Sequence, residues 1–166
     1  MILRGRVHKF GDNINTDLIA PGRYFHLRTN LPELAKHVLE DAEPDFAGKV
    51  KKGDFIVAGG NFGLGSSREH AAIVIKLAGV GAVLASSFAR IFYRNAINQG
   101  LPVLICDTSK IDDGDELEID VGQGRVTNLT RNIAIQTKPM PKAMLKILED
   151  GGLIEHFKKH GGFSLK

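Results

Sequence analysis

Residues 61–70 combine a glycine-rich turn with the residue types that bind and transform small acids. The segment reads NFGLGSSREH, so two serines, an arginine and a histidine follow closely spaced glycines. A helix that begins here leaves its first backbone N–H groups unpaired and carries partial positive charge at that end, so it can hold a carboxylate or a phosphate. Arg68 adds a guanidinium that can grip the same anion with two hydrogen bonds. The segment therefore predicts a binding site for a small anion.

Simpler interpretations explain less of this segment. Ser66 and Glu69 have the spacing of a capping box at a helix start, but a cap leaves Arg68 unexplained. His70 has the position of a packing or hydrogen-bonding histidine. A serine-hydrolase elbow requires Gly-x-Ser-x-Gly and a dinucleotide loop requires G-x-G-x-x-G, and the segment has neither order.

Buried strands and amphipathic helices alternate around this segment and must position it. Strands are predicted at residues 55–58, 81–85 and 101–106, and helices at residues 67–77 and 88–98. A β-α-β-α-β run of this kind forms a parallel sheet with right-handed crossovers. Ligands of such sheets bind beyond the carboxyl ends of the strands, which is where the glycine-serine segment falls.

Apolar residues at helical spacing predict the buried face of each of these two helices. The residues are Ile73, Val74 and Leu77 in the first helix, and Phe88, Ile91, Phe92 and Ile97 in the second. Tyr93 is predicted to join the core as well. Arg90 has no predicted role beyond a surface charge.

The remaining segments predict short elements around the parallel core. Antiparallel hairpin strands are expected at residues 116–121 and within 125–136, and helices at 34–39, 144–148 and 153–160. The predicted fold is α/β, with a parallel β-α-β-α-β core and added antiparallel hairpins. Residues 1–166 are expected to form a single domain, since the sequence contains no internal repeat or low-complexity linker.

The composition is that of an ordinary soluble domain, with 43% hydrophobic and 25% charged residues and a net charge of +3. Positive residues cluster locally only at residues 158–160, so no nucleic-acid partner is expected. The first six residues lack the apolar core of a signal peptide, and no apolar run reaches membrane-spanning length. A cytoplasmic location without a membrane partner is therefore expected.

Cys106 is the only cysteine. A single cysteine cannot form an intrachain disulfide, and it cannot complete a cysteine-based metal site without another chain. No metal ligand is predicted in this chain. Because Cys106 ends the apolar run of residues 101–106, it is predicted to be a small buried hydrophobe.

Five segments, in order and in spacing, resemble the small subunits of 3-isopropylmalate dehydratase and their aconitase-type relatives. They are residues 15–17 (NTD), 21–24 (PGRY), 61–70 (NFGLGSSREH), 87–98 (SFARIFYRNAIN) and 100–102 (GLP). The resemblance is strong over residues 9–106 and continues weakly to residues 152–155. It implies a swivel-type β/β/α domain that covers an active site whose [4Fe-4S] cluster is held by a separate, cysteine-containing large subunit. One cysteine in this chain agrees with that arrangement, since such a cluster needs about three protein thiolates or more.

The resemblance also implies a role for individual residues. Ser66 would remove the proton next to the substrate carboxylate, while the cluster acts as a Lewis acid. Ser67 and Arg68 would bind a substrate carboxylate. Asp17 would orient a neighbouring charged group, and Arg28 would contact the variable side of the substrate.

The substrate that the resemblance implies is a small hydroxy acid, isomerised by dehydration and rehydration. The main prediction is conversion of 2-isopropylmalate to 3-isopropylmalate in leucine biosynthesis. Two departures bear on it: Leu64 replaces a cysteine of many relatives, and the loop of residues 25–29 is about one residue longer. Arg28 and His26 could meet a second carboxylate, as in a homoaconitase-type enzyme, and citraconate or dimethylmalate dehydratases are further alternatives.

The quaternary structure and the broad class of function each leave alternatives open. The large and small subunits could form a heterodimer or a heterotetramer, and the free chain could self-associate. A different class of function is a stand-alone anion-binding or RNA-linked interaction module that kept the fold without the chemistry. Such a module would need no cysteine-rich partner and would bind its ligand tightly alone.

Overall fold

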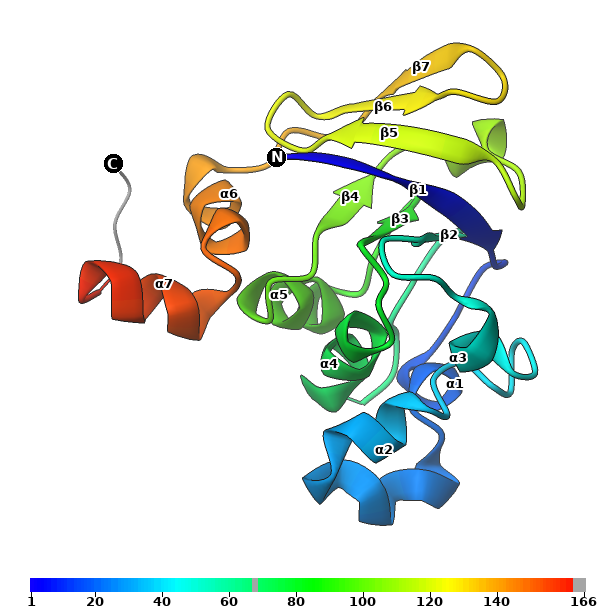
Figure 1. The fold of residues 1–166 in the computed structure, drawn as a ribbon, viewed down its shortest axis with the longest axis vertical. Helices are drawn as coiled ribbons and strands as arrows, with labels where there is room; N and C mark the ends of the chain where they lie inside the picture. Colours follow the sequence, from blue (N-terminus) through cyan, green and yellow to red (C-terminus); the bar gives the residue numbers. More distant parts are fainter. Residues whose placement is uncertain (67–68, 163–166) are drawn as a thin grey trace.

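The computed structural model describes residues 1–66 and 69–162. Within them lies one seven-stranded mixed sheet with the order β4-β3-β2-β1-β5-β6-β7 (Figure 1). The strands are β1 (Ile2–Lys9), β2 (Phe55–Ala58), β3 (Ala82–Ala85), β4 (Val103–Ile105), β5 (Glu116–Asp120), β6 (Arg125–Asn128) and β7 (Ile133–Gln136). The helices are α1 (Thr16–Ile19), α2 (Leu31–Ala35), α3 (Phe46–Lys49), α4 (Glu69–Leu77), α5 (Arg90–Asn98), α6 (Lys142–Glu149) and α7 (Leu153–His160), with the 3₁₀ helices η1 (Gly22–Thr29) and η2 (Thr108–Lys110).

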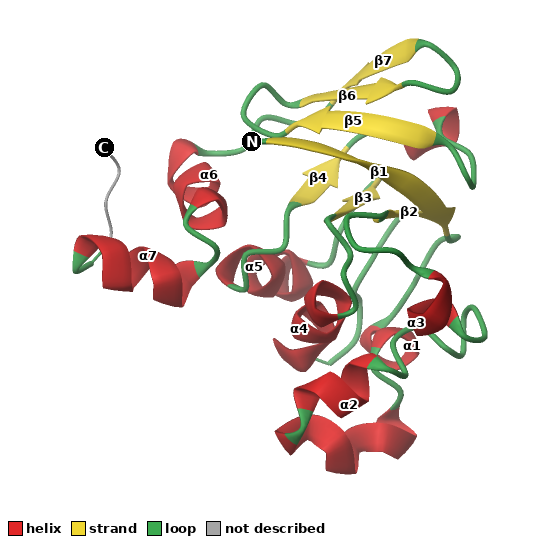
Figure 2. Ribbon diagram, viewed as in Figure 1, coloured by secondary structure: helices red, strands yellow, loops and turns green. Residues whose placement is uncertain are grey.

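One half of the sheet is the predicted parallel core. β1 pairs in parallel with β2, β2 with β3, and β3 with β4. Every residue of β2 and β3 is buried, as expected for continuous apolar runs in a parallel sheet. Helices α4 and α5, which connect these strands, lie on one side of them (Figure 2). The predicted β-α-β-α-β core is therefore confirmed.

The other half of the sheet contains the predicted hairpins. β5, β6 and β7 pair antiparallel in sequence order. They do not stand apart from the parallel core, because β1 joins the two halves. Its first residues pair antiparallel with β5, and Val7 to Lys9 pair in parallel with β2. No strand was predicted at residues 2–9, so β1 is the main element that sequence patterns missed.

The second predicted helix was wrong at its start and at one residue of its predicted buried face, Ile91. α5 begins at Arg90, because Phe88 is in a parallel bridge with Phe62 and the Ala89 N–H donates to the Phe62 carbonyl. Ile91, predicted to face inward, is 51% exposed, while Phe92 and Ile97 are buried as predicted. In the first predicted helix, Leu77 was also expected to face inward, and this was wrong. Leu77 is 50% exposed at the last position of α4.

The predicted helix boundaries elsewhere differ by a few residues. The helix predicted at residues 34–39 was largely wrong, because α2 overlaps it only at Leu34 and Ala35. α2 begins earlier, at Leu31, where the Asn30 side chain accepts a hydrogen bond from the Glu33 N–H, and residues 36–39 form a turn. The helix predicted at 144–148 is part of α6, and the helix predicted at 153–160 coincides with α7. Among the residues described, no helix has the length and apolar character needed to cross a membrane.

Candidate functional site

The segments that follow β1 and β2 run side by side, because these two strands are parallel neighbours and their carboxyl ends meet at one edge of the sheet. Backbone hydrogen bonds join residues 11–16 to residues 59–64. They run from Gly59 N to Gly11 O (3.1 Å), Asn13 N to Gly60 O (2.8 Å), Gly63 N to Ile14 O (2.7 Å) and Thr16 N to Leu64 O (2.9 Å). The glycine-rich segment thus has a fixed path up to Ser66.

Ser66 is exposed at the end of this path. The Thr16 hydroxyl, itself buried, donates to the Ser66 carbonyl oxygen at 3.2 Å. Gly65 has a φ of +115°, and a Cβ there would lie 3.0 Å from the Thr16 hydroxyl oxygen. Only glycine fits this turn without strain. Thr16 also precedes Asp17, so the same buried threonine brings Asp17 and Ser66 to one edge of the sheet.

Gly63 provides a test of this backbone path. We expect Gly63→Ala to lower the free energy of unfolding by about 1–3 kcal/mol, because overpacking of a core and backbone strain add at this position. Gly63 has a φ of +83°, and a Cβ there would lie 2.2 Å from Cγ of the buried Phe92. Urea unfolding of both chains measures the difference.

Gly11→Ala is the matched control. A Cβ at Gly11 meets nothing within 4 Å, so the free energy of unfolding should change by no more than about 0.5 kcal/mol. Equal losses in the two variants would mean that the close approach of Gly63 to Phe92 does not constrain the segment.

A cavity of about 170 Å³ adjoins Ser66. Its lining consists of Thr16, Gly63, Gly65, Ser66, Ala89, Arg90, Ile91 and Phe92. Arg90, for which only a surface charge was predicted, lines this cavity together with Ser66. The sequence signal that could have revealed it is topological, since α4 and α5 both begin at the edge where parallel strands end. The cavity combines a hydroxyl and a cation, which are suited to a small acid.

Asp17 lies in the first turn of α1 and is exposed. One of its carboxylate oxygens accepts a hydrogen bond from the Gly22 N–H at 2.8 Å. Asp17 therefore links the edge that carries Ser66 to the start of η1. This contact is also what an ordinary turn aspartate would make.

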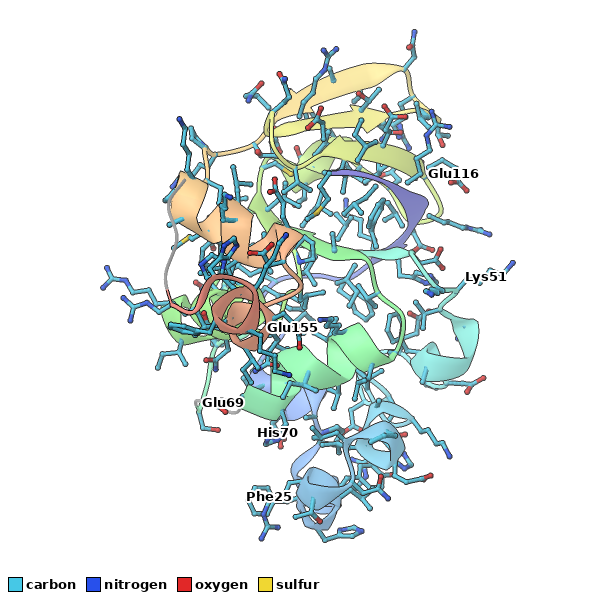
Figure 3. All side chains as sticks on the ribbon, turned by 60° about the vertical axis from the view of Figure 1, so that its left-hand side comes forward. Phe25, Lys51, Glu69, His70, Glu116 and Glu155 are labelled. Carbon is cyan, nitrogen blue, oxygen red and sulfur yellow. The ribbon has the colours of Figure 1, made fainter. Side chains whose placement is uncertain are left out.

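In helix η1, Arg28 stacks on Phe25, and the Phe25 ring reaches the start of α4. The Arg28 guanidinium donates to the Phe25 carbonyl at 3.1 Å and lies 4.3 Å above the Phe25 ring. The Phe25 ring in turn meets His70 edge-on, with 6.4 Å between ring centroids (Figure 3). Since His70 belongs to the first turn of α4, the loop of residues 25–29 lies beside the helix that follows Ser66.

The other end of η1 is tied to the turn that follows α2. Arg23 makes two hydrogen bonds of 2.7 Å to Asp41 and one of 2.6 Å to Glu40. The Tyr24 hydroxyl donates to Glu40 at 2.6 Å, and the Tyr24 ring stacks on His37 at 3.8 Å. Burial raises the pKa of Glu40, but hydrogen bonds from Tyr24, His37 and Arg23 outweigh it and hold the pKa below its ordinary value. Glu40 therefore stays charged and anchors the loop.

Two predicted carboxylate-binding residues, Ser67 and Arg68, lie outside the described residues. The predicted capping box of Ser66 and Glu69 spans them and stays a prediction.

Cys106 is 8% exposed, which confirms the prediction that it is a buried hydrophobic residue. Burial, and then the neighbouring Asp107, raise the pKa of its thiol to about 12. Such a thiol is a poor metal ligand at neutral pH, because thiolates bind metals.

Comparisons with known proteins show which family the chain belongs to. The model of the aconitase C-terminal domain family matches residues 10–108. The 3-isopropylmalate dehydratase small subunit 2 of Archaeoglobus fulgidus is 65% identical over 165 residues, covering 99% of this chain and 100% of that protein. The methanogen homoaconitase small subunit of Methanothermobacter thermautotrophicus is 58% identical over 159 residues, covering 95% of this chain and 92% of that protein.

A solved structure extends the likeness to the fold. The crystal structure of 3-isopropylmalate dehydratase from Methanocaldococcus jannaschii is 48% identical, covers 97% of this chain and 96% of its own, and superposes with a TM-score of 0.92. The sheet described above is therefore the swivel-type β/β/α fold that the resemblance implied. The chain belongs to the aconitase C-terminal domain family, among the small subunits of the 3-isopropylmalate dehydratase type.

Proposed function

We propose that this chain is the small subunit of a hydro-lyase that isomerises 2-isopropylmalate to 3-isopropylmalate, a step of leucine biosynthesis. The observation that carries the proposal is the exposed Ser66 at the edge of the parallel strands, with Asp17 and the Arg90-lined cavity beside it. The names of relatives that match almost the whole chain support the same reaction.

Ser66 is the group that takes the proton from the carbon next to the substrate carboxylate. A serine hydroxyl is an unusually weak acid, so its ionised form needs stabilisation by nearby positive charge. Helix α4 begins at Glu69, directly beyond this segment, and its N-terminal partial charge favours an anion there. Arg68 adds a full positive charge and, with Ser67, binds the substrate carboxylate. Asp17 orients a neighbouring charged group.

The proposal places the [4Fe-4S] cluster in a cysteine-containing large subunit. When bound there, the cluster supplies a Lewis acid for the substrate hydroxyl and carboxylate. The residues of this chain do not fit a cluster, because Cys106 is its one thiol, is buried and has a pKa of about 12. Size-exclusion chromatography of the purified proteins distinguishes a heterodimer from a heterotetramer and a self-associated free chain from a monomer.

The isolated chain should have no dehydratase activity and should develop no iron-sulfur chromophore on anaerobic reconstitution. Activity should appear when a large subunit with cluster cysteines is added, and the two chains should co-purify. The measurements are the absorbance and acid-labile sulfide of the reconstituted chain, and the turnover of 3-isopropylmalate with and without the partner.

Cys106→Ala is the control for this experiment and should behave as the wild-type chain does. A stoichiometric iron-sulfur chromophore on the isolated chain would contradict the placement of the cluster. Tight binding of a small acid or an RNA by the isolated chain, without turnover in the complex, would favour the stand-alone module.

A second candidate substrate follows from Arg28. Its guanidinium stacks on Phe25, whose ring meets His70 in the first turn of α4, and from there it could meet the second carboxylate of a homoaconitase-type substrate. The homoaconitase name of one relative supports this alternative. Citraconate and dimethylmalate belong to the same group of candidate acids. A panel of these acids decides among them.

We also propose that residues 1–166 form one domain in the cytoplasm and bind neither nucleic acid nor membrane. Support for one domain comes from β1, which pairs with strands of both halves of the sheet. The urea titration of the wild-type chain should then show a single transition for both halves.

A further inference from the structure

Three metal-ligating side chains meet where α6 joins α7, and no role has been assigned to them above. Asp150 is the residue at the end of α6, and His156 and His160 lie on α7. The two histidines are four residues apart, so they share one face of that helix. Figure 1 shows α6 and α7 as consecutive helices near the carboxyl end of the described chain.

The potential ligand atoms of these side chains converge. Nδ1 of His156 lies 2.7 Å from Oδ2 of Asp150, and Nε2 of His160 lies 3.0 Å from the same oxygen. All three atoms lie within 4.8 Å of one another, and the two imidazole rings have centroids 4.7 Å apart. Without a metal, the two rings can both donate hydrogen bonds to the carboxylate.

The cluster is mostly shielded from water. The His156 and Asp150 side chains are 1% and 6% exposed, and the His160 side chain is 22% exposed. The ligand atoms are therefore held by packing, and His160 forms the side that faces solvent. A rigid, partly desolvated set of ligands binds a cation more tightly than flexible surface side chains do, because less conformational entropy is lost.

The charges around Asp150 leave one of its oxygens for a cation. Lys159 contacts the other oxygen, Oδ1, at 3.1 Å. Because Lys159 and the histidines contact different oxygens of Asp150, the lysine can stay in place while Oδ2 binds a metal.

We propose that Asp150, His156 and His160 form a binding site for a divalent transition-metal cation, with Zn²⁺ as the best-suited ion. Two imidazoles and one carboxylate are the ligand set of many zinc sites, in which a water completes a tetrahedron. Metal–ligand bonds of about 2.0–2.2 Å require the ligand atoms to lie roughly 3.0–3.5 Å apart, so small side-chain shifts suffice. Each imidazole would bind through the nitrogen that faces Asp150 and carry its proton on the other nitrogen.

No metal ligand was predicted from the sequence, because cysteine ligation alone was considered there, and this proposal goes beyond that prediction. The site shares no residue with the one that contains Ser66, and its ligands hold α7 against the end of α6. Metal bound only by the folded chain would raise the stability of this helix pair by mass action.

Equilibrium dialysis of the full-length chain, prepared without a histidine tag, against Co²⁺ and Zn²⁺ tests the proposal. We expect one equivalent of metal per chain and a visible Co²⁺ spectrum of tetrahedral intensity. His160→Ala removes the partly exposed ligand, so the chain should fold, and its affinity for metal should fall by about 100-fold or more. Far-UV circular dichroism and urea unfolding check the fold of the variant.

Two more variants complete the test. His26→Ala removes an exposed histidine elsewhere and should leave the affinity unchanged, which controls for non-specific imidazole binding. Asp150→Asn keeps the shape of the ligand without its charge and should also weaken binding. Equal affinities of the wild-type chain and His160→Ala, or substoichiometric metal on the wild-type chain, would overturn the proposal.

Discussion

Replacing Ser66 with alanine should lower the turnover of the two-subunit enzyme by about 100-fold or more, which is the usual effect of losing a general base. The fold should change little. Thr16 contacts the backbone carbonyl of Ser66, which alanine retains, and a lost helix cap costs only about 0.5–2 kcal/mol. A variant that loses turnover but still assembles with the large subunit would show that Ser66 acts in catalysis and is more than a helix cap. The measurements are kcat for 3-isopropylmalate in the reconstituted complex and the stability of the isolated chain.

Ser86→Ala is the matched control for this experiment. Ser86 is also an exposed serine and follows the neighbouring strand β3 at the same edge of the sheet. Its replacement should leave kcat close to the wild-type value. If Ser66→Ala kept near wild-type turnover as well, Ser66 would be no more than a helix cap.

Replacing Arg28 with valine should shift the choice of substrate by about 10- to 150-fold in relative kcat/KM, the equivalent of one charge-assisted hydrogen bond of roughly 1.5–3 kcal/mol. Arg28 is the one permanently charged residue of the segment 24–29. It stacks on Phe25, whose ring lies against His70 in α4. Without the guanidinium, the enzyme should favour a substrate with an apolar substituent over a substrate with a distal carboxylate.

The measurement is the ratio of kcat/KM for 3-isopropylmalate to that for homoisocitrate in the reconstituted enzyme. Arg125→Val, on the distant strand β6, controls for the general loss of a surface charge and should leave the ratio unchanged. An unchanged ratio in Arg28→Val would mean that this loop does not contribute to substrate selection. The choice between the two substrate classes would then rest on other residues.

The parallel core could be predicted because its strands carry a local signal. Phe55–Ala58 and Ala82–Ala85 are continuous apolar runs, and each is wholly buried. The hairpin strands likewise alternate polar and apolar residues over short distances. β1 has no comparable signal, because arginines and a glycine separate its apolar residues and its partners lie far along the chain. Its pairing depends on tertiary structure that local patterns do not encode.

The candidate site could be predicted in part for the same reason. Ser66 stands out in a local motif, whereas its proximity to Asp17 depends on β1 lying next to β2. Arg90 was missed because the bridge between Phe62 and Phe88 delays the start of α5. Ile91 is also exposed, although helical spacing predicted that it would face inward.

The position of β1 has a consequence for how the chain folds as it is synthesised. β1 is made first, but its antiparallel partner β5 begins only at Glu116. Until then, one edge of β1 has no strand beside it, although β2 to β4 are already complete. Long-range pairings of this kind form slowly, and an open strand edge can pair with another molecule. The nascent chain should therefore be most prone to aggregate between synthesis of β4 and synthesis of β5.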